Sequence, residues 1–213
     1  MISFELLPLF AGGLLFAGVL TATALRFQLM VRMYAAASLC LAGLTIGLAL
    51  QNGASHLYLA AIATLLIKVL LIPSIFTRMA GRVGASMRLA STLRPTTTMF
   101  AIVAMLFLVL FNIQRSAFFE KVEPSYILFV SVSMVLIGFL MMILRKDIFS
   151  EVIGFLTMEN GIALFGIATI GSGPVLVEIG IFSVILIGAV LMTLLSRRVC
   201  ELYGTQSTDP LRE

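Results

Sequence analysis

The sequence predicts an all-α polytopic membrane protein with about seven transmembrane helices, an outside N-terminus and a cytoplasmic C-terminus. Of its 213 residues, 61% are hydrophobic and 11% are charged, and the mean hydropathy is +1.14. Soluble chains are roughly 45–50% apolar and about a quarter charged, so this chain has too little polar surface for a water-facing shell. The other two observations are helix-length apolar runs and an uneven distribution of positive charge.

Seven apolar runs approach the length of about 20 residues that a spanning helix needs. In chain order they cover residues 6–25, 33–50, 57–76, 97–113, 125–144, 148–170 and 174–195. Turn-forming sequences such as Gln51-Asn52-Gly53 separate them. The first run has no basic segment before it, unlike a cleavable signal. We expect a single membrane domain over residues 1–213, with a four-helix part (1–124), a three-helix part (125–198) and a cytoplasmic tail (199–213).

The basic residues predict the orientation. With the N-terminus outside, two of the fourteen lysines and arginines, Arg115 and Lys121, fall on the outer side, and Lys68 falls within the third run. The other eleven fall on the inner side: Arg26, Arg32, Arg78, Arg82, Arg88, Arg94, Arg145, Lys146, Arg197, Arg198 and Arg212. Cytoplasmic loops are enriched in Lys and Arg, so the basic pI reflects topology and not nucleic-acid binding. The longest expected connection, 77–96, carries four arginines that suit anionic lipid headgroups or a peripheral partner.

The composition also restricts the chemistry. The single histidine, His56, cannot supply paired axial haem ligands, and Cys40 and Cys200 are too few for an iron–sulfur cluster, which usually takes four cysteines. We therefore expect no cofactor in this chain, and no metal site or enzymatic activity of its own.

Three ionisable residues lie inside apolar runs, where a charge costs about 2.5–3.5 kcal/mol on insertion scales. Lys68 and Glu159 lie roughly 17 Å deep, near the midplane, and Glu178 lies roughly 6 Å below the outer boundary. One acid could pair with the lysine as a structural strut. However, buried ion pairs add little net stability, whereas coupled groups in a low dielectric can exchange protons near neutral pH. The pattern predicts a proton or ion path through Lys68, Glu159 and Glu178.

Two further residues are weaker candidates for this path. Glu151 falls in the first turn of the sixth helix, where it could favour the positive helix end or admit protons from the cytoplasm. His56 falls at the outer end of the third run, where it could be interfacial or release protons.

The sixth run predicts a helix with two different faces. Ser150, Gly154, Thr157 and Gly161 form a stripe of small residues, the kind that lets membrane helices pack closely. Glu159 lies about 180° from this stripe at about 100° per residue. We therefore expect one face to pack on a neighbouring helix and the other to direct its acid into a polar cavity or a second partner.

Three segments resemble a known family. Residues 153–161 (Ile-Gly-Phe-Leu-Thr-Met-Glu-Asn-Gly), 176–181 (Leu-Val-Glu-Ile-Gly-Ile) and 67–73 (Ile-Lys-Val-Leu-Leu-Ile-Pro) are similar to hydrogenase 4 component E, a membrane subunit of group 4 energy-converting NiFe hydrogenases and formate hydrogenlyases. The last three runs also resemble the K subunit of respiratory complex I and its Mrp antiporter counterpart. Glu178 matches the second acid of that subunit. The usual position of the first acid is Leu156 here, and Glu159 follows one turn later.

The resemblance implies a non-catalytic subunit of a complex I-like complex in a prokaryotic plasma membrane. Such a subunit couples redox chemistry in a peripheral arm to proton or sodium movement. Its implied partners are antiporter-like membrane subunits, the membrane anchor subunit, peripheral hydrogenase-like and iron–sulfur subunits, and lipids. An Mrp-type cation/proton antiporter subunit without redox function is the alternative. A seven-helix receptor or retinal pump fits only the helix count and orientation, because the intramembrane lysine is in the third run and the seventh run has none.

Overall fold

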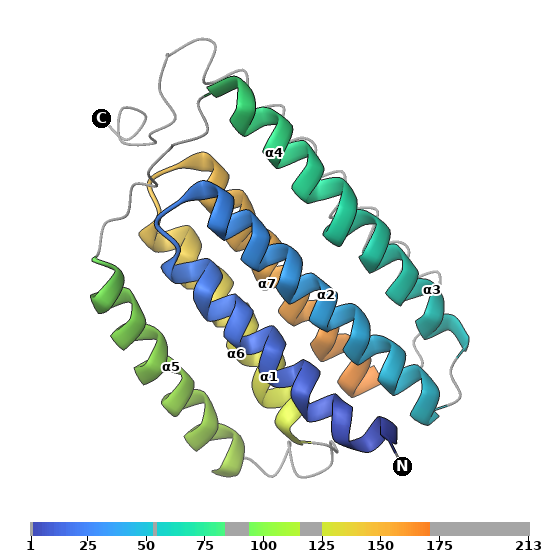
Figure 1. The fold of residues 1–213 in the computed structure, drawn as a ribbon. Helices are drawn as coiled ribbons and strands as arrows, with labels where there is room; N and C mark the ends of the chain where they lie inside the picture. Colours follow the sequence, from blue (N-terminus) through green and yellow to red (C-terminus); the bar gives the residue numbers. More distant parts are fainter. Residues whose placement is uncertain (1, 53–54, 84–93, 116–124, 171–213) are drawn as a thin grey trace.

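The computed structural model of the chain describes residues 2–52, 55–83, 94–115 and 125–170, most of which are helical (Figure 1). The helices are α1 (Ile2–Thr23), α2 (Phe27–Asn52), α3 (Ser55–Thr64), η1 (Leu65–Leu71, a π-helix), α4 (Ile72–Val83), α5 (Pro95–Arg115), α6 (Ser125–Leu144) and α7 (Ile148–Ile170). Because α3, η1 and α4 follow one another without a break, they form one long helical segment.

Five segments among the described residues are long and apolar enough to cross a membrane. They are Leu6–Thr23, Phe27–Gln51, Leu57–Arg78, Pro95–Arg115 and Ser125–Leu144. The 23 residues of α7 are also long enough to cross a membrane. The prediction of an all-helical membrane protein is therefore supported, whereas the total of seven spans and their orientation stay predictions.

Six of the seven predicted runs correspond to these helices, and the seventh, 174–195, lies outside the described residues. Two predicted boundaries were wrong. Helix α2 begins at Phe27 instead of residue 33, so Arg32 lies within the helix and is exposed. Helix α4 continues to Val83, which shortens the expected 77–96 connection. Hydropathy marks the apolar part of a helix only, and a helix can extend beyond it with arginines exposed at its ends.

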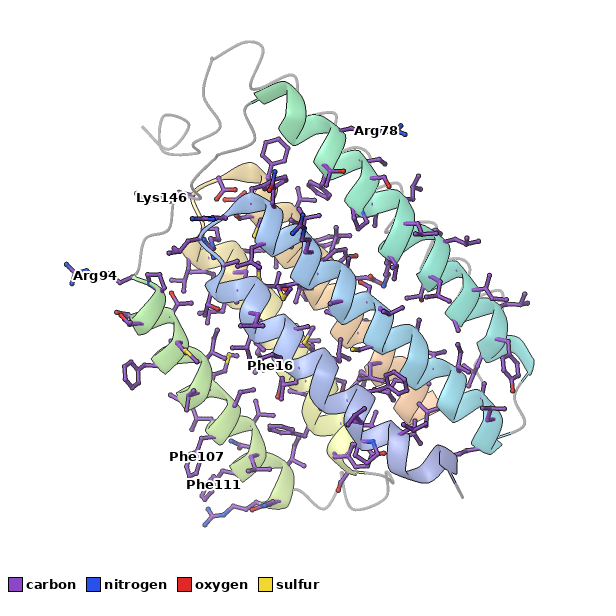
Figure 2. All side chains as sticks on the ribbon, in the orientation of Figure 1. Phe16, Arg78, Arg94, Phe107, Phe111 and Lys146 are labelled. Atoms are coloured by element: carbon purple, nitrogen blue, oxygen red, sulfur yellow. The ribbon has the colours of Figure 1, made fainter. Side chains whose placement is uncertain are left out.

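Four helices form the centre of the molecule, and the other segments flank it. Helices α1, α2, α6 and α7 lie side by side, with α5 on one side and the α3–α4 segment on the other (Figure 1). Helix α5 packs against α1 and α6, whereas the α3–α4 segment packs against α2. Of the five candidate spans, α5 is the least buried. Its Phe107 points away from the bundle (Figure 2) and is 67% exposed, as suits a helix that faces lipid or another subunit.

The helices alternate in direction, which brings basic residues to one end of the bundle. Arg78 on α4, Arg94 just before α5 and Lys146 between α6 and α7 lie at the same end in Figure 2. Arg115 is in the last turn of α5, at the opposite end. This arrangement agrees with the pattern of basic residues from which the sequence predicts a cytoplasmic face.

The π-helix has a local cause in the sequence. The Ile72 N–H donates to the Ile67 carbonyl, five residues back, instead of four as in an α-helix. The next residue, Pro73, has no N–H to donate, and proline in a helix disturbs the preceding turn. The wide turn that results contains Lys68.

Helices α6 and α7 make the most extensive contact in the described part of the chain. A Cβ atom added to Gly138 would lie 2.3 Å from the backbone nitrogen of Met158, and one added to Gly161 would lie 2.6 Å from that of Val135. A Cβ added to Gly154 would lie 2.9 Å from the Cβ of Met141. The backbones of α6 and α7 therefore approach so closely that glycine is required on both.

The short α6–α7 connection fixes two helix ends through buried charged groups. Arg145 donates from Nη2 to the carbonyls of Ala22 (2.6 Å) and Ala24 (2.7 Å), at the end of α1. The Ser150 N–H donates to Asp147 Oδ1 at 2.8 Å, so Asp147 is the N-cap of α7. Burial raises the pKa of the Asp147 carboxyl, and the Ser150 hydrogen bond and the charge of Arg145 oppose this rise. This connection holds α1, α6 and α7 together at the basic end.

A substitution at the tightest glycine tests the α6–α7 contact. We expect Gly138→Ala to destabilise the protein by about 1–3 kcal/mol, because the new methyl group must push two backbones apart. Gly12→Ala is the control, since nothing lies within 4 Å of a Cβ at Gly12, and it should keep the native stability or raise it slightly. Thermal unfolding in detergent, followed by circular dichroism, measures both. Equal melting temperatures for the two variants would contradict the close approach.

Candidate functional site: a buried ion pair between helices

The structure brings Lys68 and Glu159 into direct contact. The Nζ atom of Lys68 on η1 forms an ion pair with Oε2 of Glu159 in the middle of α7. The two side chains are only 1% and 2% exposed. Two of the three ionisable residues that the sequence places inside spans are therefore partners, although 91 positions separate them in the chain.

Two polar side chains extend this pair toward α2. Lys68 Nζ also donates to Asn160 Oδ1 at 2.9 Å, and Asn160 Nδ2 donates to Ser38 Oγ at 3.2 Å. Both Asn160 and Ser38 are completely buried. Lys68, Glu159, Asn160 and Ser38 thus form one polar cluster, which we call the lysine cluster, between η1, α7 and α2.

Apolar side chains enclose the lysine cluster on both sides along the helix axes. On the side of the basic end, Phe27, Phe76 and Phe149 contact one another with ring centroids 5.4–6.3 Å apart. They belong to a buried cluster that extends to Tyr34 and Leu156. On the other side, a second buried cluster joins α1, α2, α3, α6 and α7. The charges therefore lie in a low-dielectric layer, where electrostatic interactions are stronger than in water.

The two faces of α7 explain how Glu159 reaches Lys68. Gly154 and Gly161 pack against α6, as the stripe of small residues predicts, and Glu159 projects from the other side toward η1. In the same stripe, the Ser150 hydroxyl contacts Met30 Sδ on α2 at 3.5 Å. The acid therefore reaches a second partner within the same chain.

The remaining candidates are not part of the lysine cluster. Glu151 is partly buried in the first turn of α7, and eight residues separate it from Glu159, or about 12 Å along the helix. Buried apolar side chains of α7, including Ile153 and Leu156, lie between them. His56 is at the start of α3, about 18 Å along the helix from Lys68. Glu178 lies outside the described residues.

Asn160 and Ser38 were not predicted as site residues. Asn160 could have been found, since an amide next to a midspan acid is rare in an apolar run. Ser38 carries no such signal, because serine is common at helix contacts in membranes. Ser38 contributes to the site only because α7 packs against α2 and brings Asn160 next to it.

The lysine cluster contains the groups that proton exchange requires. A carboxylate in contact with an ammonium group can accept its proton, and the pair then becomes neutral. A charge that arrives nearby would favour one of the two states, so the pair can respond to its neighbours. Among the described residues, no group of three or more His, Cys, Asp or Glu side chains could hold a metal ion.

The fold and the site define the chain as a helical membrane protein with a charged pair in its centre. Residues 126–213 match the family of NADH-ubiquinone/plastoquinone oxidoreductase chain 4L. The chain is similar to hydrogenase-4 component E of Escherichia coli and of Shigella flexneri, each 26% identical over 94% of this chain and 93% of the relative. The predicted resemblance to both families is therefore confirmed.

Another relative is an uncharacterized protein of Mycobacterium tuberculosis, 28% identical over 95% of this chain and 93% of its own length. No solved structure matches the chain significantly. The match to chain 4L includes Glu159 but not Lys68. The lysine cluster is thus assembled from the part of the chain that matches this family and the part before it.

Single and double substitutions test the ion pair. Lys68→Met should lower stability by about 3–5 kcal/mol, because it leaves Glu159 buried without its partner. Lys68→Met combined with Glu159→Gln should recover most of this loss, since no unpaired charge remains. Thermal unfolding in detergent measures both variants, with Arg78→Met as the control for loss of an exposed charge. A double variant as unstable as Lys68→Met alone would contradict the pairing.

Proposed function

We propose that this chain is a non-catalytic membrane subunit of a complex I-like, energy-converting hydrogenase-type complex. In this proposal it couples redox chemistry in a peripheral arm to proton or sodium translocation. The observation that carries the proposal is the buried Lys68–Glu159 pair in a chain similar to hydrogenase-4 component E. The match of residues 126–213 to an oxidoreductase chain supports the same class of complex.

The burial of the pair favours a functional role over a purely structural one. Replacing a buried ion pair with apolar side chains is often neutral or stabilising by about 1–4 kcal/mol. The chain has glycine-mediated packing and two apolar clusters to hold its helices together. Charged groups inside membrane helices commonly belong to ion pathways or proton relays.

The mechanism we propose is electrostatic. When a neighbouring subunit brings a charge close to the lysine cluster, the equilibrium between the ionised and the neutral form of the Lys68–Glu159 pair shifts. Proton exchange with Glu178, through water, would pass this change along the membrane plane. Glu151 and His56 would act only at the ends of the path, Glu151 near the cytoplasmic surface of the membrane and His56 near the outer surface.

The proteins that purify with this chain test its assembly. From mild detergent we expect antiporter-like and anchor membrane subunits together with hydrogenase-like and iron–sulfur subunits, identified by mass spectrometry. An affinity tag on an unrelated membrane protein of the same cells is the control. Recovery of antiporter subunits without any redox subunit would overturn the proposal in favour of an Mrp-type antiporter.

Ion movement per electron tests the coupling. In inverted membrane vesicles that contain the whole complex, Glu159→Gln and Glu178→Gln should each reduce ion uptake per electron transferred, at equal amounts of assembled complex. A fluorescent pH dye reports proton uptake, and radioactive sodium reports sodium uptake.

The double variant Lys68→Met with Glu159→Gln distinguishes a role of the pair in ion translocation from a role in stabilising the fold. If the pair only supported the fold, this variant would assemble and translocate ions normally. We expect it to assemble but to lose translocation. Native ion uptake per electron in the assembled double variant would refute the proposed role of the pair.

A further inference from the structure

Asn160 occupies a position that the ion pair itself does not require. Its side chain is completely buried, and its Oδ1 atom accepts a hydrogen bond from Lys68 at 2.9 Å, although the ammonium group already has Glu159 as a charged partner. Lys68 Nζ is therefore held between a carboxylate and an amide oxygen that come from adjacent residues of α7.

The hydrogen bond to Ser38 anchors the end of the amide that faces away from the lysine. Asn160 Nδ2 donates to Ser38 Oγ at 3.2 Å. If the amide were rotated by a half turn, its NH₂ group would face the ammonium group, and two donors would meet. Lys68 thus requires the acceptor oxygen of Asn160, and Ser38 on α2 accepts from the NH₂ group and holds the amide in this place.

The amide differs from the carboxylate in one chemical respect. A protonated Glu159 is no longer a charged partner for Lys68, whereas the neutral amide accepts a hydrogen bond in either protonation state of Glu159. A buried ammonium group without any acceptor would be strongly unfavourable. Asn160 can therefore hold Lys68 Nζ in place, as an ammonium group or as the neutral amine, while the proton on Glu159 changes.

We propose that Asn160, held in place by Ser38, is a positioning residue that keeps Lys68 within reach of Glu159 throughout the proton exchange cycle. This inference rests on the proposed function and adds the part of the site that belongs to α2. In this proposal the contact between α2 and α7 contributes to ion translocation as well as to stability.

Substitutions of Ser38 test this inference in the whole complex. We expect Ser38→Ala to slow ion uptake about fivefold at an unchanged amount of assembled complex, as suits the loss of one hydrogen bond between neutral groups. Ser38→Thr keeps the hydroxyl group and should restore uptake to within about twofold. Asn160→Leu removes the bond to the charged group itself and should slow uptake by about tenfold or more.

Ser131→Ala is the matched control. Ser131 is also completely buried, but its hydroxyl donates to the Leu128 carbonyl of its own helix at 2.8 Å. This variant should translocate ions at the native rate. An equal loss in Ser131→Ala and Ser38→Ala would show a general packing effect and overturn the inference, as would a Ser38→Thr variant as slow as Ser38→Ala.

The outcomes separate this inference from the proposed function. If Ser38→Ala and Asn160→Leu translocate normally while Glu159→Gln does not, the positioning role is refuted and the coupling role of the pair stands. If Glu159→Gln also translocates normally, the proposed function fails as well. Should Asn160→Leu fail to assemble, the comparison of Ser38→Ala with Ser38→Thr still decides the result.

Discussion

The contact between Lys68 and Glu159 is the interaction around which the described part of the chain is organised. Two opposite charges in a low-dielectric layer must lie together, because each one alone would be strongly unfavourable. This requirement fixes the distance between η1 and α7. Other features of the fold serve the same contact: the wide π-turn before Pro73 contains the lysine, and the glycines of α7 allow its opposite face to press against α6.

The lysine cluster also joins two parts of the chain, of which only the second matches the chain 4L family. Glu159 and Asn160 belong to the part that matches oxidoreductase chain 4L, whereas Lys68 and Ser38 lie before it. A subunit built only from the matched part would keep Glu159 and Asn160 but would lack Lys68 and Ser38. In this chain the N-terminal helices therefore supply the partner for the acid. The similarity to hydrogenase-4 component E extends over both parts, since it covers 94% of the chain.

The apolar layers on either side of the cluster separate it from the charged end of the molecule. Three phenylalanine rings and the side chains around them lie toward the basic end, where Arg145 and Asp147 fix the connection between α6 and α7. Charges at this end are held by helix termini and are solvated beyond them, whereas the charges of the lysine cluster are held by one another. The molecule thus has two separate electrostatic regions, one that supports the fold and one suited to proton exchange.

The sequence alone determined the membrane setting, the approximate positions of six helices, the basic end and the three midspan ionisable residues, because hydropathy and charge are properties of short segments. It also predicted the two faces of α7 from helical periodicity. It could not determine that Glu159 pairs with Lys68, that Asn160 and Ser38 complete the cluster, or that α2 and α4 extend past their apolar runs. Those features depend on which helices face each other, and packing between segments far apart in the chain decides that.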